Sequence, residues 1–561
     1  MPRRTALADV CVDVLVIGTG PSALTLSYLL HGNTPVYEPP SAHSPPLRRP
    51  DPALHTMLSS HSDNLYGPLL HNLRLQRHLA RLHTAAAPAN VISPANYLLD
   101  ALAAPDIDIN IADARANSCL SFVHRPEHAR DHVVIGSSFM SGGQWASRDT
   151  PSRTLSYADM LSLPGYSFPE FCRDTGVATD GGEFDPYLRP QRADVAAYYA
   201  AYPPQVGIED SLLLNYTVLS LQRVASQLHP HKFIAIIQCN DTGRLHMVTT
   251  QAIVLASGVF THLVPPDPML YPFFADKPEA TVTKPPYLAL STTTPSVIVS
   301  PSEQKSSDDE RDTVLIIGSG FSAADAILSV PASRKIVHMF KWDPKSKPSP
   351  LRSCHRELYP EYAYLYRLMK SAVGLTVKKS KLDAGDNMVL GFGERYEGVP
   401  NGTLLEARHG QVKIQLADGS ILQRSVAEVK AYIGRIGVIS YLSSSLRQEI
   451  GIDGDQIWAT KMSFRKRICS RAGRWTALSL DGRAVDEQYY SLTEDMDDDD
   501  DDDDDDTSSK QYITEYAASH GFEVADGVFV IGSLVGDSLV RYTLGGCVVV
   551  AGNLIERCRA L

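Results

Sequence analysis

The chain lacks the sequence features that mark membrane-spanning, metal-binding and dithiol redox proteins. None of its apolar runs approaches the roughly 18 residues that a membrane-spanning helix needs. Its eight cysteines are scattered, with no C-x-x-C pair and no metal-ligand spacing, so we predict no metal site and no redox-active dithiol. Such cysteine usage is typical of reduced thiols, which indicates an intracellular, cytoplasmic protein. A mitochondrial association is left open.

The chain also has little net charge once one segment is set aside. The formal net charge is −12 over 561 residues, and residues 497–506, which are all aspartate, account for −10 of it. The rest of the protein is nearly neutral and has no basic stripe, which argues against nucleic acid as a partner. We predict a disordered acidic insertion over about residues 480–510 and assign it no chemistry.

Near the N-terminus the chain carries the pattern of a dinucleotide-binding turn. Residues 14–17 are apolar and mostly β-branched, as in a strand buried on both faces of a parallel sheet. The next residues spell G-x-G-x-x-G/A and open a helix over residues 22–30, whose free N–H groups and dipole favour a pyrophosphate. The residues assigned to this phosphate site are Gly18, Gly20, Pro21, Ser22 and Ala23.

An acid follows this turn at a suitable distance. Glu38 lies twenty residues after Gly18, where a carboxylate would accept hydrogen bonds from ribose hydroxyls. The connection is shorter than in most such units, so a solvated acid at a strand end is the alternative interpretation.

A second glycine-rich segment reads Gly142-Gly143-Gln144-Trp145. Two consecutive glycines let the backbone pass close to a flat ring system, and Trp145 offers an aromatic wall, so Gly143 and Trp145 are predicted to lie beside a cofactor. The alternative is a glycine turn with a core tryptophan.

The strand, turn and helix pattern recurs in the middle of the chain. Residues 314–317 are apolar and follow Thr313 in a strand, and Gly318, Gly320, Ser322 and Ala323 repeat the small and helix-opening positions of the first turn. The next strand-like run ends in Lys341, where a cation favours the 2′-phosphate of NADP over the ribose of NAD. A solvated strand-end lysine is the alternative.

Near the C-terminus another apolar strand ends in Gly536-Asp537. In a flavoprotein, the glycine would leave room for the isoalloxazine ring and the aspartate would bind a ribityl hydroxyl. Arg541, four residues later, is the candidate cation near the flavin, and an ordinary structural arginine is the alternative.

Together these motifs predict an α/β fold with two Rossmann-like domains, in which an FAD domain is interrupted by an NADPH domain and carries loop insertions. We expect an FAD-binding part over residues 1–290 with a long insertion at about 39–130, an NAD(P)H-binding domain over 291–440, and the rest of the FAD domain over 441–561. The absent dithiol argues against a disulfide reductase.

Several segments resemble known flavoprotein families. The Gly-Gly-x-Trp segment and the strand ending Ala256-Ser-Gly258 resemble flavin-dependent monooxygenases of the flavin-containing, Baeyer–Villiger and N-hydroxylating group. The F-x-G-x-x-x-H segment of that group is not matched, since residues 273–280 lack its glycine and histidine. Leu358-Tyr-Pro-Glu-Tyr362 and Gly532-Ser-Leu-Val-Gly-Asp537, with Leu155-Ser-Tyr157 and Leu163-Pro-Gly165, resemble the oxidative stress-induced growth inhibitor family.

This resemblance implies a class B monooxygenase-like fold whose members are discussed as FAD- and NADPH-dependent monooxygenases and as regulators of growth, autophagy and cell death. It implies FAD at Gly18, Gly20, Ala23 and Glu38, flavin contacts near Trp145 and Asp537, and NADPH at Gly318, Gly320, Ala323 and Lys341. The implied reaction passes hydride from NADPH to FAD and activates O2 at flavin C4a for a small-molecule substrate. An NADPH oxidase without oxygen transfer, or a regulatory protein with little turnover, remains open, as do protein partners.

Overall fold

A computed structural model gives the structure of the chain. It describes residues 10–39, 52–86, 91, 93–105, 107–108, 111–112, 114–146, 152–177, 184–224, 232–260, 262–273, 313–343, 349–356, 358–374, 395–452, 456–458, 522–537 and 539–559. The acidic run at 497–506 and the segment 274–312 lie outside these residues. The described residues up to Phe260 and from Ile436 onward form one compact unit, and residues 262–435 form a second. The two units are described separately.

The first unit is built on an eight-stranded sheet whose centre is parallel. Its main path runs in the order β19 (Glu523–Ala525), β20 (Val528–Val530), β8 (Leu245–Leu255), β1 (Val10–Ile17), β4 (His132–Gly136) and β5 (Leu212–Leu214). Val14 of β1 pairs with His132 on one side and with Ala252 on the other, in parallel register. The C-terminal strand β20 is parallel to β8, so the end of the chain returns to the sheet of the first turn. The antiparallel strands β6 (Tyr216–Arg223) and β7 (Phe233–Cys239) extend the sheet from β8.

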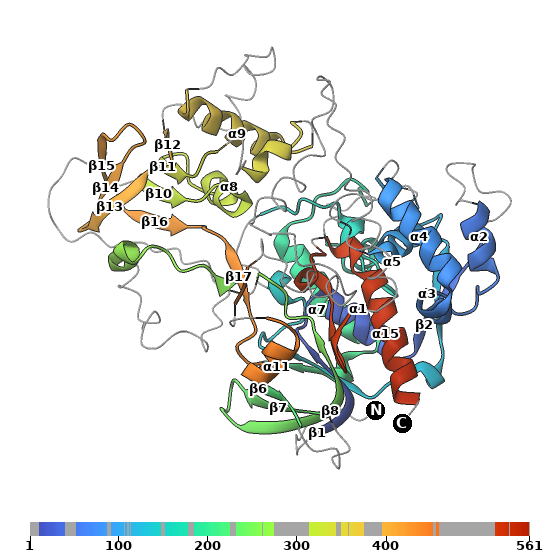
Figure 1. Cartoon of the computed structure of the whole chain (residues 1–561). Coiled ribbons are helices and arrows are strands. Elements are labelled where there is room, and N and C mark those ends of the chain that lie inside the picture. Colours follow the sequence, from blue (N-terminus) through green and yellow to red (C-terminus); the bar gives the residue numbers. More distant parts are fainter. Residues whose placement is uncertain are drawn as a thin grey trace. The chain divides into compact units, whose positions relative to one another are not determined.

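Helices cover this sheet, and its core is formed by apolar side chains. Residues 14–16 of β1 are fully buried, as expected for a strand with both faces covered. Helix α1 (Pro21–Leu30) lies beside the C-terminal helix α15 (Leu544–Arg559) in Figure 1, and α15 also packs on α5. The other helices of the unit are α2 (Pro52–Ser59), α3 (Tyr66–His71), α4 (Leu73–Ala86), α5 (Pro94–Ala103), α6 (Phe168–Thr175), α7 (Arg192–Val206) and α11 (Ser444–Glu449).

The insertion expected at about 39–130 is not only a loop. Its described residues contain α2 to α5 and the strand β3 (Leu120–His124), which pairs antiparallel with β2 (Asn33–Tyr37) in a separate two-stranded sheet. The N-terminus of helix α5 is capped, since the Ser93 side chain accepts a hydrogen bond from the Ala95 N–H and Pro94 occupies the first helical position. The insertion therefore contributes to the core, and Leu98 and Leu99 are buried.

The second unit contains a parallel four-stranded sheet of its own. The order is β12 (Tyr396–Pro400), β11 (Lys335–Phe340), β10 (Thr313–Ile317) and β16 (Glu428–Ala431). Val314 and Ile316 pack against α8 (Phe321–Leu328) and α9 (Pro360–Ala372), whereas Leu315 packs with the antiparallel strands β13 (Thr403–Arg408), β14 (Gln411–Gln415) and β15 (Ile421–Ser425). The predicted mixed α/β class with parallel sheets is confirmed. Further short strands are β9 (His262–Leu263), β17 (Arg435–Val438) and β18 (Gln456–Trp458).

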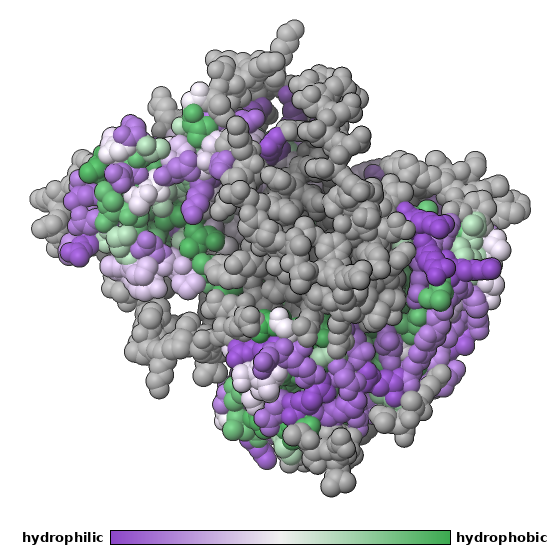
Figure 2. Space-filling view, viewed as in Figure 1, coloured by the Kyte–Doolittle hydropathy of each residue, from purple (hydrophilic) through white to green (hydrophobic). Residues whose placement is uncertain are grey.

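Figure 2 shows how apolar and polar described residues are distributed on one face of the molecule. In the view of Figure 2, hydrophobic residues are interspersed among hydrophilic ones wherever described residues are seen. Scattered apolar side chains of this kind are ordinary on a protein surface.

One buried polar atom makes the packing of α1 testable. Thr25 is 1% exposed, and its hydroxyl has no hydrogen-bond partner among the described residues. An unsatisfied buried hydroxyl is costly, so Thr25→Val is expected to raise the free energy of unfolding by about 1 kcal/mol. Thr250→Val is the matched control, because the buried Thr250 hydroxyl donates to the Asp13 and Ala252 carbonyls and its loss should destabilise. Denaturant unfolding measures both, and a destabilised Thr25→Val variant would contradict the assignment.

Candidate functional site

The first glycine turn has a backbone that only glycine can supply. Gly18 has φ +119°, and a Cβ there would lie 2.3 Å from the carbonyl oxygen of Ala256, at the end of β8. Its N–H donates to the Ile135 carbonyl of β4 at 2.8 Å, which ties the turn to the strands on both sides. The requirement at Gly18 is therefore one of backbone conformation and close approach.

The start of α1 is left open for an anion. Gly20 is the N-cap residue, Pro21 occupies the first turn, and neither a capping side chain nor an acid is present there. A Cβ on Gly20 would have no heavy atom within 4 Å, so space remains beside the turn. Ser22 and Ala23 follow on the helix. Uncapped N–H groups at a helix N-terminus form an anion site, and a pyrophosphate therefore fits this turn.

The second glycine segment packs directly on the first turn. The Gly142 N–H donates to the Thr19 carbonyl at 2.8 Å, and a Cβ on Gly143 would lie 2.9 Å from Cα of Gly20. Gly142 and Gly143 both have positive φ, which lets the chain enter the short 3-10 helix η2 (Gly143–Trp145). The half-buried Trp145 ring lies 6.5 Å from the Tyr199 ring, centroid to centroid. The structure thus brings together two segments that are distant in sequence.

The C-terminal segment also reaches the first turn. A Cβ on Gly532 would lie 2.5 Å from Oγ of Ser22, and the Cys547 thiol donates to the Ser22 carbonyl at 3.3 Å. Gly536 has φ +101°, and Asp537 next to it is buried, with one carboxylate oxygen accepting a hydrogen bond from Asn96 at 2.8 Å. Asp537 is therefore tied to the insertion helix α5, and the ribityl contact stays a prediction.

Glu38 does not lie where the sequence argument placed it. A ribose contact from Glu38 would require the strand before it to be a neighbour of β1, but the neighbours of β1 are β4 and β8, and β2 pairs with β3 instead. The exposed Glu38 carboxylate accepts a hydrogen bond from Ser121. At the end of β4 the chain has Gly136, where a Cβ would lie 2.4 Å from the Thr19 side chain. The apolar run of β4, before Gly142-Gly143, indicates a strand in the sequence, but it does not indicate that this strand pairs with β1.

The second glycine turn repeats the geometry of the first. Gly318 has φ +143°, and a Cβ there would lie 2.3 Å from the carbonyl oxygen of Tyr432, immediately after β16. Gly320 is the N-cap of α8, with no capping side chain and no acid in the first helical turn, which contains Ser322 and Ala323. Each turn thus meets the end of a parallel neighbouring strand of its own sheet.

Lys341 lies beside this second turn. It is exposed at the end of β11, its N–H donates to the Ser319 hydroxyl at 3.1 Å, and that hydroxyl donates to the Lys341 carbonyl at 3.0 Å. Arg334 lies at the opposite end of β11, where Glu428 engages it at 2.5 Å. Lys341 therefore lies at a strand end beside the second turn, and its contact with a 2′-phosphate stays a prediction.

A buried histidine under the second turn was missed by sequence reasoning. His338 of β11 is 2% exposed, with Nε2 2.7 Å from the Gly318 carbonyl and Nδ1 2.8 Å from the Tyr396 hydroxyl. Nε2–H therefore donates to the glycine and Nδ1 accepts from the tyrosine. Burial lowers the pKa of His338 to about 4, so the ring is neutral at neutral pH. A histidine inside an apolar strand was the available signal.

This histidine makes the second unit sensitive to acid. In the unfolded chain the His338 pKa is near 6.5, and in the folded unit it is about 4, so the unfolded state binds more protons between these values. The free energy of unfolding is therefore expected to fall as the pH drops below 6.5, by up to about 3 kcal/mol. Thermal unfolding at a series of pH values measures this loss. His338→Gln should flatten the profile, and an unchanged profile would contradict the assignment.

Arg541, the candidate catalytic cation, is held by two carboxylates. Its guanidinium donates to both oxygens of Asp100 at 2.9 and 2.6 Å and to both oxygens of Asp108 at 2.6 and 3.0 Å, and its side chain is 8% exposed. Burial alone would lower the pKa of Arg541, but the bonds to the two aspartates outweigh it and raise it. These hydrogen bonds favour the alternative interpretation, in which Arg541 is an ordinary structural arginine.

Loss of this arginine should destabilise the first unit without acting on catalysis directly. Removing one partner of a buried ion pair leaves uncompensated charge, so Arg541→Ala is expected to lower the free energy of unfolding by about 3 kcal/mol. Chemical denaturation measures the loss. If the variant that remains folded reduces a bound cofactor at the unchanged rate, the structural role is supported, and a selective rate loss at full stability would contradict it.

The part of the chain that the structure describes contains neither a candidate metal site nor a candidate membrane-spanning helix. Within it, no three histidine, cysteine, aspartate or glutamate side chains are grouped so as to hold a metal ion. No helix in that part combines the length and apolarity needed to cross a bilayer.

Comparison with characterised proteins finds relatives along nearly the whole chain. No family model matches. The human protein named oxidative stress-induced growth inhibitor 1 is 24% identical over 569 residues, covering 97% of this chain and 95% of the relative. The human oxidative stress-induced growth inhibitor 2 is 24% identical over 383 residues, covering 64% of this chain and 69% of the relative.

Solved structures with a distant likeness are also found. A flavin-containing monooxygenase from Stenotrophomonas maltophilia has a TM-score of 0.40 and 13% identity, with 98% of this chain and 99% of that chain covered. A bacillithiol disulfide reductase from Staphylococcus aureus has a TM-score of 0.37 and 11% identity, with 77% and 79% covered. Likenesses at this level assign no function. The similarity over almost the full length confirms the family resemblance seen in the sequence motifs: the chain is similar to the oxidative stress-induced growth inhibitors.

Proposed function

We propose that the chain is an FAD-dependent, NADPH-using oxidoreductase of the monooxygenase type. The observation that carries the proposal is the repeated geometry of the two turns, each with a strained first glycine against a neighbouring strand end and an uncapped helix start. Such turns are suited to pyrophosphate, and two in one chain are suited to two dinucleotides. The similarity to oxidative stress-induced growth inhibitors is compatible with this function.

FAD is assigned to the first turn because three segments meet there. Gly18, Gly20 and the start of α1 would hold the pyrophosphate, with Gly142 and Gly143 packed against the turn. The bare Cα of Gly20 leaves open space beside the turn, whereas the lack of a side chain at Gly18, Gly142 and Gly143 lets the neighbouring segments pack closely. When bound, FAD would supply two-electron redox chemistry with hydride and O2, whereas the protein supplies binding, orientation and exclusion of water.

NADPH is assigned to the second turn. Gly320 and the uncapped start of α8 would hold its pyrophosphate, and the exposed Lys341 would offer its ammonium to the 2′-phosphate. His338 positions the turn from below, since its Nε2–H holds the Gly318 carbonyl in place. Because His338 is neutral, it adds no charge of its own beneath the phosphates.

The test is a balance of substrates and products under air. FAD-loaded protein is mixed with NADPH or NADH, and coenzyme oxidation, O2 uptake and H2O2 are measured together. The proposal expects faster oxidation of NADPH than of NADH, with less H2O2 than O2 consumed once an oxygen acceptor is supplied. Equal amounts of H2O2 and O2 with every acceptor would indicate an NADPH oxidase, and no oxidation of either coenzyme would contradict the enzymatic proposal.

A further inference from the structure

A cavity in the first unit lies apart from the glycine turns. It has a volume of about 570 Å³, which is in the range that small-molecule sites occupy. Its wall comes from α1, α5, the chain before β3, the 3-10 helix η3 (Ala158–Leu161), α6 and the 3-10 helix η10 (Val540–Tyr542). No residue of Gly18–Ala23, Gly142–Trp145 or Gly532–Asp537 lines it. We call it the insertion cavity, because residues 100–122 of the insertion form one side.

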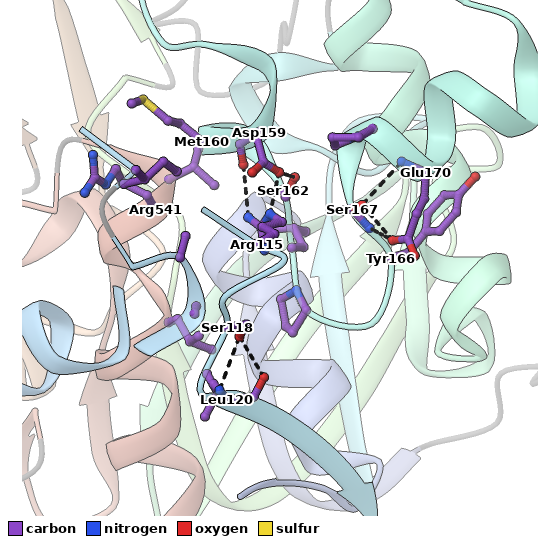
Figure 3. A pocket seen from close by; sticks show the side chains of 18 of the residues that line it. Arg115, Ser118, Leu120, Asp159, Met160, Ser162, Tyr166, Ser167, Glu170 and Arg541 are labelled. Carbon is purple, nitrogen blue, oxygen red and sulfur yellow. Dashed lines mark hydrogen bonds and ion pairs between the residues drawn. The ribbon is translucent and has the colours of Figure 1, made fainter. Parts of the chain in front are cut away.

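Most charged groups on the wall are already paired. In Figure 3, Arg115 lies next to Asp159, to which its Nε donates, and Nη2 donates to the Asp159 carbonyl at 3.0 Å. Arg541 is held by Asp100. One oxygen of Glu170 accepts from the N–H and hydroxyl of Ser167 at 2.6 and 2.7 Å, which caps α6. Few charged side chains on the cavity wall are therefore available to bind a ligand.

Two guanidinium groups on the wall keep donors without a partner among the described residues. Nη1 of Arg115 is one, since the bonds of that side chain use Nε and Nη2. The exposed guanidinium of Arg173 on α6 is the other. Both line the cavity together with apolar residues such as Ile107, Phe122 and Leu163.

We propose that the insertion cavity binds a small organic carboxylate with an apolar body. A guanidinium matches the two oxygens of a carboxylate, and both Arg115 and Arg173 have donors left for it. The carboxylates of Asp100, Asp159 and Glu170 on the wall offset the arginines, which favours a single negative charge over a phosphate dianion. The apolar body of the ligand lies against the aliphatic and aromatic wall. This site is independent of the assignment of FAD and NADPH to the glycine turns.

The test is a binding titration on the full FAD-loaded chain, measured by heat release. The probes are N-acetylphenylalanine and hydrocinnamate, each compared with its neutral primary amide. Each acid is expected to bind about tenfold more tightly than its amide. Arg173→Ala should weaken the acids about tenfold and leave the amides unchanged. Arg244→Ala is the matched control, because Arg244 is exposed in the same unit and does not line the cavity.

Two further variants test whether the ligand binds inside the insertion cavity or elsewhere on the protein surface. Ala116 is exposed at the wall, so Ala116→Trp should fill space without disturbing the core and reduce binding of acid and amide at least about tenfold. Thr25→Val should leave the binding of both unchanged, because the Thr25 hydroxyl is fully buried and is not open to the cavity. Absence of binding by both acids, equal binding of acid and amide, or binding unchanged by Arg173→Ala overturns the proposal. Because the readout is heat of binding, failure of the redox function does not affect it.

Discussion

Gly20→Ala is expected to give a folded protein that binds FAD about a thousandfold more weakly, which corresponds to about 4 kcal/mol. Gly20 has φ −76°, which alanine adopts readily, and its Cβ would meet no heavy atom within 4 Å. The added methyl group therefore costs little in the free protein but occupies the space proposed for the pyrophosphate. Flavin absorbance per protein after reconstitution measures binding, and thermal unfolding of the flavin-free protein checks the fold.

The control for this experiment is Gly67→Ala. Gly67 lies on α3 and its Cβ would also have no heavy atom within 4 Å, so the same chemical change is made away from the turn. This variant should retain the full flavin content. If Gly20→Ala retained it as well, no phosphate would lie at the first turn, and the assignment of FAD would be wrong.

Gly320→Ala is expected to retain FAD and to weaken NADPH binding by a similar factor of about a thousand. Gly320 has φ −103°, and the nearest heavy atom to its Cβ would be Cγ of Pro350 at 3.8 Å, so the fold tolerates the methyl group. The rate of flavin reduction measured against NADPH concentration without oxygen gives the affinity. Loss of FAD with NADPH binding retained would reverse the roles of the two turns.

The local parts of this account could be predicted from the sequence. An apolar run followed by G-x-G and a helix is a short-range pattern, and both copies form as expected, with Gly18 and Gly318 at positive φ. A strand also forms near the C-terminus, but β20 ends at Val530 and not at the predicted Gly536-Asp537, because Gly532–Leu534 is a 3-10 helix.

The pairing between distant segments could not be predicted in the same way. Glu38 was predicted to bind ribose because it lies twenty residues after Gly18, yet the strands that pair with β1 are β4 and β8, which lie far along the chain. The two aspartates that hold Arg541 come from the insertion, 441 and 433 residues away. Nothing in the spacing of one sequence specifies such partners, which depend on how the insertion packs on α15.

The helices of the insertion show a second reason why part of the fold could not be predicted from the sequence. The first part of the segment is rich in proline, histidine and serine, so its composition indicated a surface insertion, although helices were expected within it. Its apolar residues, including Leu58, Leu79 and Leu99, are nevertheless buried in the main core of the unit. Tertiary burial outweighs local composition here. The insertion cavity and the contact from Asn96 to Asp537 follow from that packing.

The most direct test of the account is the visible absorption spectrum of the purified chain, recorded before and after NADPH is added without oxygen. The account predicts a flavin spectrum that NADPH bleaches much faster than NADH does, and that Gly320→Ala leaves unbleached at the same NADPH concentration. A colourless protein that takes up no added FAD would contradict the central claim that the two glycine turns bind two dinucleotides.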